Sequence, residues 1–201
     1  MFLSGMGGTG KSEVIKSFEY FVKNISSSLD WVYDEKNAIA ITALTGAASC
    51  EIPHGKTLHS QGCLFISDIK INQEHKSRWA KTRMVIMDEI SFLSVSLLKT
   101  LNKKTRILTE IEAMYGKVHV VFVGDFFQIP PCQGVPIYQG DSMQFGALNR
   151  AVFLNKSHRF NDDPDFGKII RKFRAGTITK EDVQKINTQY VTNDGIKLLP
   201  I

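Results

Sequence analysis

Short runs of apolar residues alternate along the chain with longer segments in which apolar positions recur at helical spacing. The runs predict buried strands, because each is only a few residues long and most are bounded by Gly, Asp or Asn. These strand candidates are Met1 to Ser4, Ala38 to Ala43, Met84 to Met87, Val118 to Val123 and Ala151 to Leu154. Strands that alternate with helices are typical of a parallel sheet covered on both faces, so the sequence predicts an α/β fold.

Helical spacing predicts a core-facing helix between the third and fourth strands, with Ser94 as its N-cap and Gly116 as its C-terminal stop. A second helix is predicted over Pro164 to Ala175, closing near Gly176, and the segment Thr179 to Asp182 resembles the capping box of a third. The apolar stripe of the first helix, expected to be core, consists of Leu97, Leu101, Leu108, Ile111 and Tyr115.

Composition and length favour one globular domain with a short appendage. The chain has 201 residues, of which 43% are hydrophobic and 22% charged, which is enough for one sizeable core. We therefore expect a main domain over residues 1–160 and a helical extension over residues 161–201. Two segments, Ser26 to Ser28 and Gln133 to Gln144, are expected to be loops.

Charge and cysteine usage narrow the function classes. A net charge of +5 fits a polyanionic partner but is also found in many proteins that never bind one. The three cysteines are widely spaced and odd in number, which favours neither a disulfide framework nor a zinc site. No apolar run is long enough for a membrane span and no signal peptide is visible, so we expect a soluble, intracellular chain without a membrane partner.

The strongest local pattern is Gly5-Met-Gly-Gly-Thr-Gly-Lys-Ser12, which follows a predicted strand and precedes an amphipathic segment. Its glycines allow successive backbone N–H groups to converge on a phosphate at a helix N-terminus. Lys11 would reach the β- and γ-phosphates of ATP, and the Ser12 hydroxyl would ligate Mg²⁺. The expected nucleotide-binding residues are Gly5, Gly7, Gly8, Thr9, Gly10, Lys11 and Ser12.

Two further strands deliver polar residues at their carboxyl ends, where open α/β sheets bind ligands. Asp88 and Glu89 come at the carboxyl end of the strand that begins at Met84. Asp88 is the candidate for holding Mg²⁺ through water, and Glu89 is the candidate general base for an attacking water. Gln128 follows the next strand and could contact the γ-phosphate. The alternative for that segment makes Gln128 a loop residue and places Phe126 and Phe127 in the core.

Small and hydroxyl residues after the second strand suit close approach to a sugar-phosphate backbone, although helix capping explains Thr45 and Thr57 equally well.

Near the end of the main domain, Arg159 could stabilise charge that develops on the γ-phosphate, or be an ordinary surface arginine. Basic residues outnumber acidic ones between Lys70 and Arg106 and between Arg150 and Lys180, either as a groove for nucleic acid or as solvated helix faces.

Taken in order, these segments resemble the first RecA-like motor domain of a superfamily 1 helicase, and most closely the Pif-one family, which includes relatives in helitron transposons. The resemblance spans nearly the whole chain. It implies an ATP-dependent helicase that moves 5′-to-3′ on single-stranded DNA, unwinds DNA forks, and acts in recombination, repair and telomere maintenance in the nucleus, in mitochondria or in a virus. The segments that carry it are Gly5 to Ser12, Thr45 to Ala48, Thr57 to Ser60, Asp88 to Ser91, Gly124 to Pro131 and His158 to Phe160.

The resemblance also implies DNA contacts from Thr45, Gly46, Thr57, His59 and Ser60. His59 and Phe127 are possible stacking faces for bases, with core packing the preferred interpretation for Phe127. Family members carry an adenine-contacting segment before the first motif and a second RecA-like domain after the last, and neither is visible here. The second domain is therefore expected from a longer protein or another chain. Two alternatives remain, a non-catalytic nucleic-acid-binding remnant and a phosphate-loop ATPase of another lineage.

Overall fold

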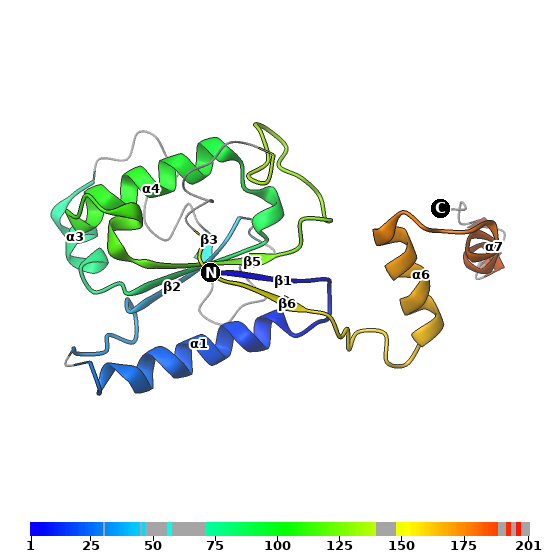
Figure 1. The fold of residues 1–201 in the computed structure, drawn as a ribbon, viewed down its shortest axis with the longest axis horizontal. Helices are drawn as coiled ribbons and strands as arrows, with labels where there is room; N and C mark the ends of the chain where they lie inside the picture. Colours follow the sequence, from blue (N-terminus) through cyan, green and yellow to red (C-terminus); the bar gives the residue numbers. More distant parts are fainter. Residues whose placement is uncertain are drawn as a thin grey trace. The chain divides into compact units, whose positions relative to one another are not determined.

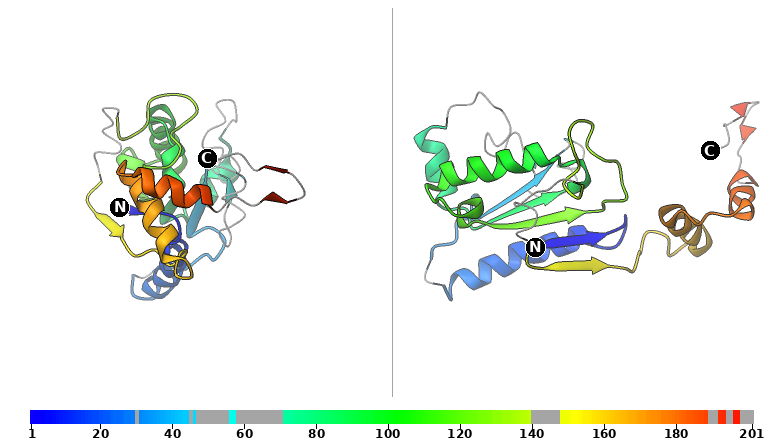
Figure 2. Two further views of the ribbon diagram at one scale, coloured as in Figure 1. Left: turned by 90° about the vertical axis from the view of Figure 1, so that its right-hand side faces the viewer. Right: turned by 45° about the horizontal axis from the view of Figure 1, so that its top comes forward.

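The computed structural model describes residues 1–29, 31–44, 46, 56–57, 71–139, 148–188, 192–193 and 196–197. They divide into two compact units, Met1–Ser157 and His158–Ile201. The first unit contains a parallel sheet and its covering helices (Figure 1). The second contains two helices and a short hairpin, drawn in red in Figure 2. The expected division at residues 160 and 161 lies close to this boundary, and the assignment of functional domains to the two units stays a prediction.

The sheet of the first unit has six strands in its described part, in the order β3-β2-β4-β5-β1-β6, and each neighbouring pair is parallel. The carboxyl ends of all strands therefore meet at one edge. This confirms the predicted α/β fold, although most strand boundaries differ by one residue from those expected. The strands are β1 (Phe2–Gly5), β2 (Ile39–Ala43), β3 (Lys56–Thr57), β4 (Met84–Asp88), β5 (His119–Gly124) and β6 (Ala151–Leu154).

Helices cover both faces of the sheet (Figures 1 and 2). Because side chains of a strand alternate between faces, Val85 and Met87 of β4 belong to one core cluster, while Met84 and Ile86 belong to the other. Helix α1 (Lys11–Ser26) covers the second cluster. Helices α3 (Gln73–Trp79) and α4 (Val95–Thr109) cover the first, and two 3₁₀ turns flank α4, η1 (Ile90–Phe92) and η2 (Met114–Lys117).

Helix α4 begins as predicted but ends earlier. The Ser94 hydroxyl accepts the N–H of Leu97 at 3.4 Å, as an N-cap does. The helix stops at Thr109, where Glu110 takes a left-handed conformation with φ 57°, so the expected stop at Gly116 is wrong. Gly116 instead closes the returning chain against α4, because a Cβ there would collide with the Thr109 side chain and lie 2.9 Å from the Thr105 carbonyl oxygen.

The stripe predicted for this helix is correct for its central members. Leu101 and Leu108 are fully buried, whereas Ile111 is 37% exposed and is not core. Tyr115 is buried from η2 rather than from the helix, and its N–H donates to the Asn102 side chain at 2.8 Å. Ser26, expected in a loop, is instead the buried last residue of α1.

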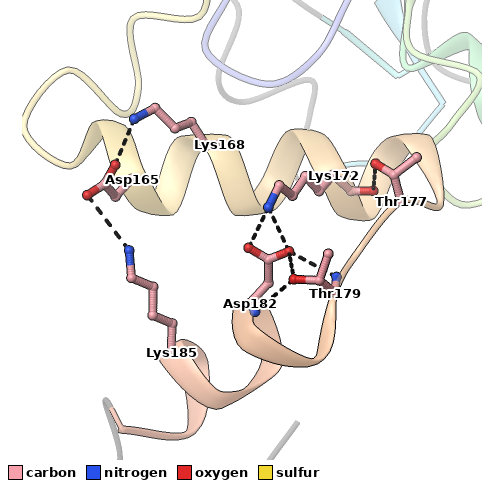
Figure 3. Close-up of polar contacts among 7 residues, drawn as sticks. All are labelled: Asp165, Lys168, Lys172, Thr177, Thr179, Asp182 and Lys185. Carbon is pink, nitrogen blue, oxygen red and sulfur yellow. Dashed lines mark hydrogen bonds and ion pairs between the residues drawn. The ribbon is translucent and has the colours of Figure 1, made fainter.

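The second unit contains α6 (Pro164–Ala175), α7 (Lys180–Thr188) and the hairpin of β7 (Thr192–Asn193) and β8 (Ile196–Lys197). Helix α6 has the predicted bounds, and Gly176 closes it with φ 66°. The predicted capping box also forms (Figure 3): the Asp182 carboxylate accepts the Thr179 N–H at 2.9 Å, and the Thr179 hydroxyl accepts the Asp182 N–H at 3.3 Å.

An ion pair joins the two helices of this unit (Figure 3). Lys172 of α6 donates to both carboxylate oxygens of Asp182, at 2.7 and 2.8 Å. These bonds, together with those from Thr179, lower the pKa of Asp182 to about 2. None of the described helices in either unit is long and apolar enough to cross a membrane.

Candidate nucleotide and DNA site

The segment between β1 and α1 has the backbone geometry of a phosphate-binding loop. Gly8 and Gly10 take positive φ angles of 77° and 89°, which residues with a Cβ rarely adopt. At Gly5 a Cβ would collide with the Thr9 hydroxyl and approach Leu154 of the neighbouring strand at 3.1 Å. The shape of the loop thus favours glycine at positions 5, 8 and 10.

Lys11 spans this loop from the first turn of α1. Its ammonium donates to the carbonyl oxygens of Gly5 at 2.7 Å and Met6 at 3.2 Å, and the Thr9 hydroxyl donates to the same Met6 oxygen at 2.8 Å. The N-cap residue, Gly10, has no side chain to accept the first N–H groups of the helix. The start of α1 can therefore direct backbone donors and one ammonium at an anion.

Asp88 and Glu89 lie at the carboxyl end of β4, two strands away from the phosphate loop in the sheet order. Asp88 is 9% exposed, and its Oδ1 accepts the N–H of Glu89 at 2.8 Å. Glu89 leaves the strand in a left-handed conformation, with φ 56° and ψ 43°. Such a conformation is uncommon for residues other than glycine, and it turns the chain sharply beside the predicted catalytic edge.

Strand β5 lies between β4 and β1 and ends in the segment that contains Gln128. Asp125 is 2% exposed; its Oδ1 accepts the N–H of Phe127 at 3.0 Å, and its carbonyl oxygen accepts the N–H of Gln128 at 3.1 Å. These bonds make a tight turn that leaves Gln128 exposed. The strand order brings this turn, the Asp88 carboxylate and the phosphate loop to one edge of the sheet.

The two phenylalanines of this turn have opposite environments. Phe126 packs on Phe2, with ring centroids 5.0 Å apart, and on Tyr138 at 5.1 Å. Phe127 is 72% exposed, so the preferred interpretation of Phe127 as a core residue is wrong. The turn directs one ring into the core and the other outward, and the sequence alone does not distinguish them.

The remaining predicted site residues are distributed over several segments. Ser12 is exposed on the first turn of α1. Thr57 is half-buried and pairs with Ala43 at the carboxyl end of β2, and Gly46 follows the same strand. Arg159 belongs to the second unit and is exposed. The other three DNA-contact predictions, Thr45, His59 and Ser60, lie outside the described residues.

One contact at the site had no signal in the sequence. The Ser157 hydroxyl donates to the Gly7 carbonyl at 3.2 Å, across 150 positions of the chain. Ser157 follows β6, whose last residue, Leu154, pairs with Gly5. The segment after β6 therefore runs beside the phosphate loop and is tied to it by this hydrogen bond. Only the parallel pairing of β1 and β6 brings these residues together.

The oxygen donors at this edge suit a magnesium ion. Mg²⁺ is usually held by one or two carboxylates together with phosphate oxygens and water, and Asp88 and Ser12 supply a carboxylate and a hydroxyl. Among the residues that the structure describes, no group of three or more His, Cys, Asp or Glu side chains could bind a metal by itself. Such a site would need the nucleotide phosphates to complete its coordination.

Comparisons with known proteins agree with this architecture. The chain is similar to the ATP-dependent DNA helicase PIF1 of Emericella nidulans, with 29% identity over 202 residues covering 92% of this chain and 26% of that protein. The crystal structure of Pif1 helicase from Candida albicans aligns with a TM-score of 0.77 and 26% identity, over 98% of this chain and 46% of that one. A Bacteroides Pif1 crystallised with single-stranded DNA has the same fold, with a TM-score of 0.74 and 24% identity, over 96% of this chain and 46% of that one.

These matches confirm the predicted RecA-like fold. They also show that the chain spans about a quarter of the length of its curated relatives and about half of the solved chains. A family model described as PIF1-like helicase matches residues 1–184, and so covers all of the first unit and more than half of the second. The chain therefore belongs to the family of PIF1-like helicases.

Proposed function

We propose that this chain is the ATP-hydrolysing first motor domain of a 5′-to-3′ DNA helicase. The observation that carries the proposal is the Lys11 ammonium held across a phosphate loop, at the edge of the sheet where Asp88 and Gln128 also lie. A longer protein or another chain would supply the second RecA-like domain, since the chain covers 26% of its Emericella relative. The cellular roles that we propose are DNA recombination, repair and telomere maintenance.

In this proposal the phosphate loop binds the β- and γ-phosphates of ATP through its backbone N–H groups, and Lys11 neutralises their charge. Ser12 and Asp88 hold Mg²⁺, which would neutralise charge on the same phosphates. The buried position of Asp88 at the end of β4 supports its role, because a rigid strand end fixes where the carboxylate points. Gly5, Gly7, Gly8, Thr9 and Gly10 complete the binding loop.

Hydrolysis needs a group that accepts a proton from water as its oxygen attacks the γ-phosphorus and ADP leaves. Glu89 is our candidate for that base, and Gln128 for the group that orients the water or contacts the γ-phosphate. Both follow strand ends that are adjacent in the sheet. Arg159 is proposed to stabilise charge on the γ-phosphate.

Single-stranded DNA is the proposed polymer partner. Thr57 ends β3 and Gly46 follows β2, at the same edge of the sheet as the nucleotide residues. With Thr45, His59 and Ser60 they are proposed to contact the sugar-phosphate backbone. The exposed Phe127 ring, beside Gln128, is suited to stack on a base. A nucleotide sensor and a base-stacking ring on one turn would link hydrolysis to movement along the strand.

The test is steady-state ATP hydrolysis by the chain with Mg²⁺, with and without single-stranded DNA. We expect turnover that DNA stimulates and that Lys11→Ala abolishes. Lys16→Ala is the matched control, because Lys16 is an exposed lysine of the same helix whose ion pair, within the described part of the chain, is the local one with Glu13 at 2.6 Å. Turnover that persists in Lys11→Ala, or nucleotide binding that is absent from the wild-type chain, would contradict the proposed function.

A further inference from the structure

The end of β5 lies directly against the peptide that joins Glu89 to Ile90. A Cβ added at Gly124 would be 2.9 Å from the backbone N of Ile90 and 2.8 Å from its Cγ2, both closer than Cβ contacts in real proteins. Gly124 also has a φ of 150°, which disfavours any residue with a side chain. Two independent constraints therefore require glycine at this position.

The peptide that Gly124 contacts belongs to the turn of the proposed catalytic base. Glu89 is left-handed, and a non-glycine residue keeps this conformation only where its surroundings determine it. Other constraints also act on the turn. The Asp88 carboxylate accepts the Glu89 N–H, the Glu89 carbonyl accepts the Phe92 N–H at 3.1 Å, and the Ile90 side chain is fully buried. Gly124 adds a backbone contact from the neighbouring strand β5.

We propose that Gly124 is a positioning residue for Glu89: the bare backbone at the end of β5 supports the Glu89–Ile90 peptide and so fixes where the Glu89 carboxylate lies over the nucleotide. The proposal rests on the proposed ATPase function. Gly124 also directly precedes the Asp125 turn that presents Gln128. One residue thus sets the spacing between the group that accepts the proton and the group that orients the water.

A methyl group at Gly124 would force the Glu89–Ile90 backbone to move by roughly half an ångström or more, since ordinary contacts begin near 3.4 Å. A misplacement of about 1 Å at a reacting group can lower a rate by about 100-fold. The phosphate loop, in contrast, is made by β1 and α1 and does not include this contact. We therefore expect a methyl group at Gly124 to lower kcat without weakening nucleotide binding.

The test compares Gly124→Ala with Gly116→Ala in the full chain, using Mg²⁺, ATP and single-stranded DNA. Gly116 has a positive φ of 62° and also lacks room for a Cβ, but it lies in η2, which precedes β5 and is at the opposite end of that strand from Glu89. Gly116→Ala therefore reproduces the structural cost of placing a Cβ at a crowded glycine with a positive φ, away from Glu89. We expect Gly124→Ala to lower kcat by about 10- to 100-fold with KM within about twofold, and Gly116→Ala to keep the wild-type kcat.

Two further readouts cover the case in which Gly124→Ala folds poorly. Ile90→Leu keeps the side-chain volume but removes the Cγ2 methyl beside Gly124, and should lower kcat by about 3- to 10-fold at unchanged KM. Binding of ADP alone should be unaffected in these variants, whereas binding of ADP with aluminium fluoride, which mimics the transferred phosphate, should weaken by the same factor as kcat.

The outcomes separate the two proposals. Wild-type kcat in both Gly124→Ala and Ile90→Leu, or an equal loss in Gly116→Ala, would overturn the positioning role and leave the ATPase function intact. A wild-type chain without Lys11-dependent turnover would instead overturn the proposed function, and the positioning role with it.

Discussion

The backbone N–H of Glu89 donates to Oδ1 of Asp88 at 2.8 Å, so the two adjacent carboxyl residues are held in a fixed relation. Asp88 ends a buried strand in extended conformation, whereas Glu89 begins a left-handed turn and is partly exposed. The hydrogen bond joins the last strand residue to the first turn residue. The roles of the two residues can also be separated, because the amide oxygen of an asparagine at position 88 could accept the Glu89 N–H in place of the carboxylate.

Asp88→Asn and Glu89→Gln should therefore fail in different ways. Asparagine at position 88 keeps the acceptor for the Glu89 N–H but loses the charge proposed to hold Mg²⁺, so Mg²⁺-dependent nucleotide affinity should fall. Glutamine at position 89 should keep nucleotide affinity and lower kcat by about 10²- to 10⁴-fold, the usual contribution of a general base. Titration calorimetry and steady-state kinetics measure both effects, and equal losses of affinity in both variants would contradict this division of roles.

Phe127→Ala should weaken binding of single-stranded DNA without changing the stability of the fold. The ring is 72% exposed, and removing one base-stacking aromatic ring costs about 1–3 kcal/mol of binding free energy. Fluorescence anisotropy with a labelled oligonucleotide gives the affinity. Tyr20→Ala is the matched control, because Tyr20 is 74% exposed on the outer side of α1 and has no proposed contact with DNA. If both variants bind as the wild type does, the stacking role of Phe127 is excluded.

Leu101→Ala should destabilise the first unit by about 2–5 kcal/mol, because it leaves a cavity in a fully buried part of α4. Ile107→Ala on the same helix should change the free energy of unfolding by about 0.5 kcal/mol or less, since Ile107 is 44% exposed. Urea denaturation followed by tryptophan fluorescence reports on this unit, which contains both tryptophans, Trp31 and Trp79. Similar midpoints for the two variants would contradict the assigned core.

The helix pair of the second unit should lose stability in acid. Its contacts with Lys172 and Thr179 lower the pKa of Asp182 from 3.8 to about 2, so the folded state holds this proton less tightly than the unfolded state does. The stabilisation is complete above about pH 4 and is lost as the pH falls from there through about 2. The carboxyl carbon shift of Asp182 in NMR should titrate near pH 2, and Asp182→Asn should remove this part of the acid dependence. A midpoint near 3.8 would show that the ion pair does not form.

Local signals in the sequence account for much of the fold. The Gly5 to Ser12 segment, the strand cores and helix α6 with its caps were all predictable, because glycine, proline and capping side chains act on their immediate neighbours. The capping box of Thr179 and Asp182 is another such case. For the nucleotide site, it was enough to recognise which polar residues follow strands, because the carboxyl ends of parallel strands meet at one edge of the sheet.

Contacts between distant segments account for what the sequence did not reveal. Gly116 is a strong local stop signal, yet α4 ends seven positions earlier because the chain must return against the helix to enter β5. The bond from Ser157 to Gly7 and the close approach of Gly124 to Ile90 depend on strand order rather than on spacing. Which of Phe126 and Phe127 is buried depends on the Asp125 turn, whose bonds are visible only in three dimensions.

The position of β1 between β5 and β6 also constrains the order of assembly during synthesis. Phe2 pairs with Phe122 on one side and Ala151 on the other, so the phosphate loop cannot acquire its final shape until a ribosome has made the whole first unit. At 5–20 residues per second, the roughly 120 residues between β1 and its first partner β5 leave β1 unpaired for about 6 to 24 seconds. Such distant pairing predicts slow folding and a nascent chain that depends on chaperones until β6 has emerged.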